Sequence, residues 1–176
     1  AISVLNQRNT RYASMVHSTD ENIGRLLSFL KDKNLYDNTL IIFTSDNGGL
    51  STQARLAPTS TKPLRAGKGW LYEGGIRIPQ LIKFINQKNQ HLIDVPVVSY
   101  DLFTTVFNHL KLNHNLDEKD GIDLSFSNKK IKRDYILWHF PHYHGSLWKP
   151  GSAIRNGDWK LLKFYEENKL ELYNLK

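Results

Sequence analysis

A short apolar run at Ile41–Phe43 leads within a few residues into Asp46, Asn47 and two glycines, and this stretch constrains the fold more than any other. β-Branched and aromatic residues are typical of a buried central strand. In an open α/β sheet, ligands bind just beyond the carboxyl ends of the strands, where Asp46 and Asn47 would lie. A carboxylate next to a carboxamide provides hard oxygen donors, which suit Ca²⁺ or Mg²⁺ better than zinc. The same residues also fit an ordinary strand that ends in an Asn-Gly turn.

A second segment, residues 62–79, combines four glycines, two prolines and four cations. Within it, Lys68 stands between Gly67 and Gly69. This arrangement allows a ligand to approach the backbone closely while the ammonium supplies a compact positive charge. A tetrahedral oxyanion needs that combination, although a lone Gly-Lys-Gly tripeptide is a weak indication by itself.

Three ordered motifs resemble those of the sulfatase family, in the alkaline phosphatase-like superfamily. They are TSDNGG at 44–49, PLRAGKG at 63–69 and EGGIRIP at 73–79. The resemblance extends from about Tyr12 to a closing AIRNGDWKLL at 153–162 and the end of the chain. It implies an α/β fold: part of an alkaline phosphatase-like mixed sheet with flanking helices, plus a small antiparallel C-terminal subdomain.

The resemblance also assigns roles to residues that match the motifs. It implies that Asp46 and Asn47 are two ligands of the active-site cation, usually Ca²⁺ with Mg²⁺ possible, and that Lys68 contacts the sulfate and takes part in catalysis. The family's catalytic formylglycine is made from the Cys or Ser of a C/S-x-P-x-R motif, and this chain has no cysteine. The segment 61–65 has the spacing, but threonine cannot be oxidised to the aldehyde. Formylglycine is therefore expected outside this chain.

The function implied by the resemblance is that of a sulfatase, hydrolysing the sulfate esters of a sulfated saccharide or an aryl sulfate. The 176 residues would be inactive alone and would require a missing N-terminal part of the same protein. Two alternatives stay open. A phosphate or phosphonate ester hydrolase of the same superfamily would use the same metal and cationic loop, and a non-catalytic polyanion-binding pseudoenzyme would need no nucleophile. The family also implies a periplasmic or secreted location.

The net charge of +7, from 24 Lys and Arg against 17 Asp and Glu, predicts attraction to anions. The cations are dispersed except at residues 129–133, and no nucleic-acid-binding signature accompanies them, so we expect no nucleic-acid partner. No apolar run approaches the ~20 residues that span a bilayer, and we expect no membrane partner. A sulfated polysaccharide would suit both the charge and the family.

Helical periodicity predicts an amphipathic helix at about 11–33, whose apolar face we expect to be core packing. A strand at 40–45 then completes an αβ unit. A second helix is expected at 101–110, capped by Ser99 or Asp101.

The polar residues 111–128 predict a boundary between two parts. Residues 1–128 would form the C-terminal half of the catalytic α/β domain, and residues 129–176 a small antiparallel β subdomain. Asn156-Gly157 is typical of a hairpin turn. Four strands are expected in the second part, at 135–140, 153–155, 159–164 and 169–173.

The segment 138–145 concentrates three histidines and three aromatic residues on a loop with proline and glycine. We expect His139 and His142 to bind substrate, because imidazole and aromatic groups suit a sugar ring and its hydroxyls. Zinc binding is disfavoured because no carboxylate or thiolate completes a site nearby in sequence. The alternative is an aromatic strand end that packs between subdomains.

Overall fold

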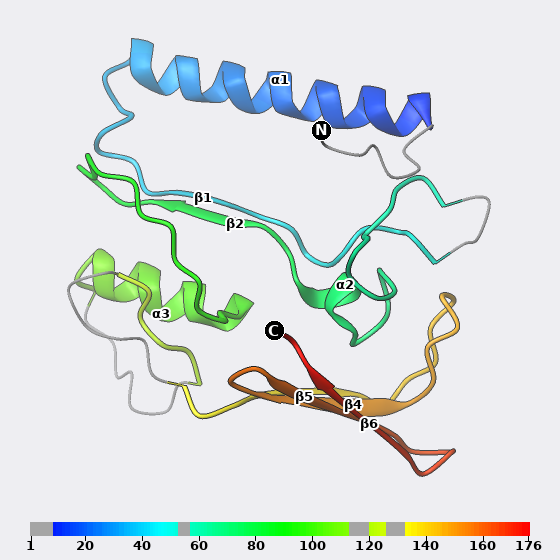
Figure 1. Cartoon of the computed structure of the whole chain (residues 1–176). Coiled ribbons are helices and arrows are strands. Elements are labelled where there is room, and N and C mark those ends of the chain that lie inside the picture. The colour runs from blue at the N-terminus through cyan, green and yellow to red at the C-terminus, as the bar shows by residue number, and fades with distance from the viewer. Residues whose placement is uncertain (1–8, 53–56, 113–119, 126–132) are drawn as a thin grey trace. The chain divides into compact units, whose positions relative to one another are not determined.

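The computed structural model describes residues 9–52, 57–112, 120–125 and 133–176 (Figure 1). β1 and β2 pair in a two-stranded sheet, while β3 to β6 form an antiparallel sheet in sequence order. The contacts divide the chain into two compact units, the first containing α1, α2 and the four-stranded sheet, the second containing α3. The elements are α1 (Thr10–Asp32), β1 (Ile41–Thr44), α2 (Glu73–Ile76), β2 (Gln80–Lys83), α3 (Ser99–His109), β3 (Ile136–Phe140), β4 (Gly151–Asn156), β5 (Trp159–Phe164) and β6 (Lys169–Asn174).

The helix α1 matches the predicted amphipathic helix to within about a residue at each end. It begins after Asn9, whose side chain accepts a hydrogen bond from the Tyr12 N–H at 3.0 Å. None of its residues is buried, and its large apolar side chains are between 53% and 67% exposed at Met15, Val16, Leu26 and Phe29. The prediction that this face is packed in a core is therefore wrong for the described part of the chain. An apolar stripe of this kind is typical of an interaction surface.

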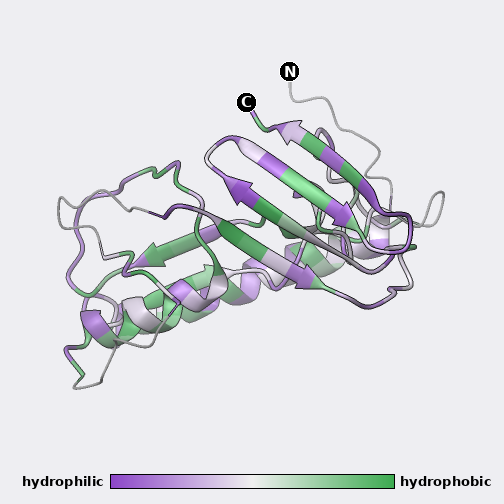
Figure 2. Ribbon diagram, turned by 90° about the horizontal axis from the view of Figure 1, so that it is seen from below, coloured by the Kyte–Doolittle hydropathy of each residue, from purple (hydrophilic) through white to green (hydrophobic). Residues whose placement is uncertain are grey.

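The four-stranded sheet has two different faces, and Figure 2 shows hydrophobic and hydrophilic residues alternating along its strands. One face carries Trp138, which pairs with Ala153 of β4, and Leu162 of β5, which pairs with the same alanine. This face packs on the loop that precedes α2, and its core comprises Leu71, Tyr72, Trp148, Ala153, Leu162 and Phe164. The antiparallel C-terminal sheet and its Asn156-Gly157 turn are as predicted. The predicted boundary at residue 128 lies outside the described residues and stays a prediction.

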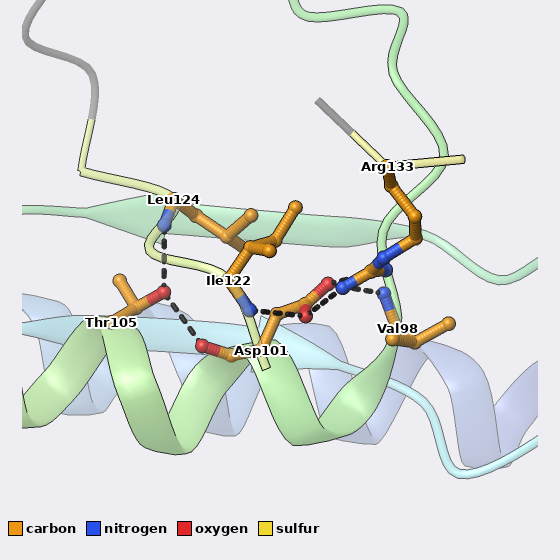
Figure 3. Close-up of polar contacts among 6 residues, drawn as sticks. All are labelled: Val98, Asp101, Thr105, Ile122, Leu124 and Arg133. Atoms are coloured by element: carbon orange, nitrogen blue, oxygen red, sulfur yellow. Dashed lines mark hydrogen bonds and ion pairs between the residues drawn. The ribbon is translucent and has the colours of Figure 1, made fainter. Parts of the chain in front are cut away.

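A buried carboxylate organises the start of α3 (Figure 3). Asp101 accepts hydrogen bonds from the Val98 N–H at 2.8 Å and the Ile122 N–H at 3.0 Å, and both of its oxygens contact the guanidinium of Arg133. The helix begins after Val98, so neither Ser99 nor Asp101 is the N-cap, but Asp101 at the third helical position accepts the Val98 N–H as in a capping box. Arg133 belongs to the basic cluster at 129–133, and this buried pairing gives it a structural role. No helix in the described part of the chain has the length and apolar character needed to cross a membrane.

Candidate active site

The predicted metal ligands lie immediately beyond the end of β1. The strand ends at Thr44, whose hydroxyl donates a hydrogen bond to the Pro79 carbonyl at 3.2 Å. The Ser45 hydroxyl then donates to the Asn47 carbonyl at 2.9 Å, which holds the turn that carries Asp46. Hydrogen bonds therefore fix both the end of the strand and the turn that follows it.

The turn after β1 packs backbone against backbone on the glycine-rich segment. The Gly48 N–H donates to the Gly75 carbonyl at 2.8 Å, and the Lys68 N–H donates to the Gly49 carbonyl at 2.9 Å. A Cβ on Gly48 would lie 1.8 Å from the Gly74 carbonyl oxygen, so no side chain fits at this position. These contacts bring the backbone of Lys68 beside the loop that carries Asp46 and Asn47.

Thr61, which has the spacing of the family's nucleophile, is committed to loop structure. Its hydroxyl lies 3.0 Å from the Ser51 hydroxyl and donates to the Ala66 carbonyl. Both contacts use the hydroxyl, the one polar atom of this side chain, to hold the loop.

Glu73 joins the glycine-rich segment to the four-stranded sheet. One carboxylate oxygen lies 2.7 Å from Lys160 Nζ, and the other lies 3.7 Å from Arg155 Nη1. Lys160 is only 1% exposed, and its ammonium lies over the Trp138 ring, 5.1 Å from the centroid. Burial lowers the pKa of Lys160, and the adjacent carboxylate opposes this effect. Glu73 is therefore the charge that makes a buried ammonium tolerable.

This ion pair is not apparent from the sequence, because 87 positions separate its members. One feature of the sequence nevertheless indicates that Lys160 needs a partner. In β5, Lys160 alternates with Leu162 and Phe164, so the strand period places it on the inward face. An inward-facing lysine requires an acidic partner.

A second polar cluster holds the same segment against β6. The Tyr72 and Tyr173 hydroxyls donate to Glu171 at 2.5 and 2.6 Å, and the Arg65 guanidinium lies 4.1 Å from the Tyr72 ring centroid. Burial raises the pKa of the Glu171 carboxyl, but hydrogen bonds from Lys169 and the two tyrosines outweigh it and lower that pKa to about 2. Arg65 therefore helps to hold this loop against β6, because it contacts both Tyr72 and Tyr173.

The two histidines predicted to bind substrate lie in different surroundings. The His139 Nδ1 lies 3.0 Å from the Ser152 hydroxyl and 2.7 Å from the Tyr165 hydroxyl. Its strand position places it on the sheet face opposite to Trp138. His142 is exposed, with its ring 6.2 Å from that of Phe140. Neither contact joins these rings to the Lys68 loop.

A third histidine, His144, is not among the predicted substrate-binding residues, yet it contacts that loop directly. A Cβ built on Gly69 would lie 2.1 Å from His144 Nδ1 and 2.5 Å from the Ser146 hydroxyl. The Trp70 indole N–H also donates to the Ser146 carbonyl at 2.8 Å. The segment after β3 is therefore anchored beside Lys68 through His144 and Ser146. No local sequence signal separates His144 from the other two histidines.

Asp46 and Asn47 fit a divalent cation by the chemistry of their oxygens, but two donors are too few. Calcium takes about six to eight oxygen ligands. Among the described residues, no group of three or more His, Asp or Glu side chains is placed to hold a metal ion. A metal site that includes the Asp-Asn pair would therefore need further oxygen ligands.

Residues 4–112 match the family described as Sulfatase. A sulfatase from Formosa agariphila is 32% identical over 200 residues, which cover 97% of this chain and 34% of that protein. The chain spans about a third of the length of these and other curated relatives that it matches.

Two solved structures show the same architecture. The phosphonate monoester hydrolase SpPMH from Silicibacter pomeroyi matches with a TM-score of 0.65 at 20% identity, covering 88% of this chain and 32% of its own. The PsFucS1 sulfatase from Pseudoalteromonas sp. matches with a TM-score of 0.56 at 29% identity, covering 90% of this chain and 33% of its own. The alkaline phosphatase-like α/β fold predicted from the motifs is confirmed, and the first of these likenesses shows the fold alone.

Proposed function

Since this chain belongs to the sulfatase family, we propose that it is the C-terminal part of an enzyme that hydrolyses sulfate esters of a sulfated carbohydrate. The observation that carries the proposal is the pair of backbone hydrogen bonds from Gly48 and Lys68, at 2.8 and 2.9 Å. These bonds hold the turn that carries Asp46 and Asn47 next to the loop that carries Lys68. A sulfate ester bound together with a metal ion needs oxygen ligands for the metal and a cation for the sulfate in one place. An aryl sulfate would serve as the small substrate.

The proposed roles follow from charge and ligand chemistry. Asp46 and Asn47 hold the cation, with Ca²⁺ preferred over Mg²⁺, and sulfatases are generally metal-dependent. The bound cation supplies positive charge that offsets the sulfate oxygens. Lys68 adds an ammonium to the same anion, where charge develops in the transition state. The formylglycine nucleophile and the remaining metal ligands would come from a missing N-terminal part, so the 176 residues alone are expected to be inactive.

We also propose partners and a location for the full-length protein. The exposed apolar stripe of α1, represented by Met15 and Leu26, suits burial against the missing N-terminal part of the protein. A location in the periplasm or outside the cell suits a saccharide substrate. The phosphate or phosphonate hydrolase and the polyanion-binding pseudoenzyme are less well supported, because the family match favours sulfate chemistry.

Replacing Lys68 by Ala in the full-length protein tests this function. We expect kcat/KM for an aryl sulfate to fall about 10²-fold or more, the scale for removing one preorganised electrostatic donor. Lys68→Arg should restore activity only partly, because a bulkier planar group must fit between two glycines. Steady-state kinetics measures both variants.

The matched control for this experiment is Lys62→Ala, which removes another exposed lysine from the same loop. It should retain the activity of the unmodified protein. Near-normal kinetics for Lys68→Ala would show that Lys68 is an ordinary surface residue and would remove the cationic loop from the proposed site.

His139 and His142 stay predicted sugar contacts, and two substrates separate this role from catalysis. Substituting either by Ala should strongly impair hydrolysis of a sulfated oligosaccharide while sparing an aryl sulfate, which lacks the sugar. Equal losses on both substrates would contradict the prediction. A lower melting temperature for His139→Ala would instead show that its contacts with Ser152 and Tyr165 are structural.

A further inference from the structure

The ring of His144 packs closely against Gly69, the residue that follows Lys68. Gly69 has a φ of +84°, which favours glycine, and a Cβ there would meet His144 Nδ1 at 2.1 Å and Cε1 at 2.5 Å. The backbone of the cationic loop is thus in direct contact with an imidazole ring from the segment that follows β3. The ring has no room to move toward the loop.

The orientation of this ring is defined by hydrogen bonds at one end. Its Nδ1 accepts the Ser146 N–H at 3.2 Å and lies 2.8 Å from the Ser146 hydroxyl. The backbone is fixed as well, because the His144 N–H donates to the Trp148 carbonyl at 3.2 Å. Trp148 is buried and Ser146 is 6% exposed, so these partners belong to the packed interior.

These contacts determine which nitrogen carries the proton. A nitrogen that accepts a backbone N–H has no hydrogen of its own, so neutral His144 is protonated at Nε2. Within the described residues, Nε2 has no hydrogen-bond partner, although the ring is half-buried. A half-buried donor whose other end is clamped is preorganised to bind a ligand.

We propose that His144 is a further substrate-binding residue, donating its Nε2–H to an oxygen of the anion bound by Lys68. The inference rests on the proposed function, because it takes the position of the anion from Lys68. It differs from the roles assigned to His139 and His142, which concern the sugar. The ligand class is a tetrahedral oxyanion on an ester.

Two isosteric substitutions separate binding from structure. In His144→Asn, a side-chain oxygen replaces Nδ1 and keeps the clamp on Ser146, but the distal donor is lost. In His144→Gln, an amide N–H reaches the place of Nε2, but the clamp is lost.

Inorganic sulfate is the probe, as a competitive inhibitor of aryl sulfate hydrolysis by the full-length protein. The control is Tyr143→Phe, because Tyr143 is exposed and contacts Glu166.

We expect the inhibition constant of sulfate to rise about tenfold in His144→Ala and His144→Asn, which is the loss of one hydrogen bond to a charged group. His144→Gln should retain most of the affinity, and His144→Asn should keep the melting temperature. The reverse order, with Asn restoring affinity and Gln not, would overturn the proposal. So would an unchanged inhibition constant in a folded His144→Asn variant.

A second arm with inorganic phosphate distinguishes failure of this inference from failure of the proposed function. If the unmodified enzyme cleaves phosphate esters and no sulfate ester, the proposed function is wrong. The same variants then test His144 through the inhibition constant of phosphate, with the same expected order.

Discussion

Replacing Glu73 by Ala in the full-length protein should lower the free energy of unfolding by about 3–5 kcal/mol. The substitution leaves the ammonium of Lys160, 1% exposed, without the carboxylate that lies 2.7 Å away. The loss has an upper limit, because the buried lysine can release its proton instead of staying charged. Deprotonation costs about 1.4 kcal/mol for each unit by which the pH lies below the ordinary pKa of lysine. At pH 7 that limit is about 5 kcal/mol. Denaturant unfolding measures the change.

The pH dependence of this variant provides a second signature. Burial already lowers the pKa of Lys160 in the presence of Glu73, and removing the carboxylate takes away the group that opposes burial. Below the ordinary pKa of lysine, the unfolded chain then binds up to one proton more than the folded protein. Stability must therefore rise with pH, by up to about 1.4 kcal/mol per unit until the unfolded lysine itself titrates. The deficit should thus be smaller at pH 9 than at pH 7.

A double variant tests whether stability depends on the ion pair itself or only on not leaving one of its charges buried without a partner. Because burial of the charge costs more than the attraction returns, Glu73→Gln combined with Lys160→Met should recover most of the loss. As a control, Glu167→Gln breaks a mostly exposed pair with Lys149 and should leave stability nearly unchanged. A Glu73→Ala variant as stable as the control would show that Lys160 reaches solvent.

The full-length Asp46→Ala variant should lose activity by a factor on the order of 10³, because a bound cation provides several kcal/mol of charge stabilisation. It should also lose stabilisation by calcium, which amounts to about 2.7 kcal/mol at a concentration of 100 times Kd. Both losses have one cause, since removal of the carboxylate leaves the cation under-coordinated. A calcium titration followed by thermal unfolding measures the second effect.

The control for this experiment is Asp94→Ala, which removes an exposed carboxylate outside the site. It should leave both readouts unchanged. Full calcium stabilisation in Asp46→Ala would contradict the assignment of the ligand. The isolated 176-residue chain should bind calcium weakly in either case, because two ligands do not complete a site.

Local patterns predicted most elements correctly. The periodicity at 11–33 corresponds to α1, the apolar run at 40–45 contains β1, and the alternation after residue 135 corresponds to the antiparallel sheet. These features depend on neighbouring residues in the sequence, so they can be recognised without tertiary information. The ordered motifs also identified the family correctly. The apolar face of α1 was recognised, but its burial was not predictable, because burial depends on what covers it.

The sequence by itself determined most of the elements, the family and the candidate residues Asp46, Asn47 and Lys68. Tertiary structure decided how distant segments meet. It placed Gly48 against Gly74, paired Glu73 with Lys160, and brought His144 to Gly69. The physical reason is that the sequence records which groups need a partner, such as a lysine on an inward strand face, but not which distant group supplies it. That choice depends on the path of the loops and the register of the strands, which form only when the chain packs.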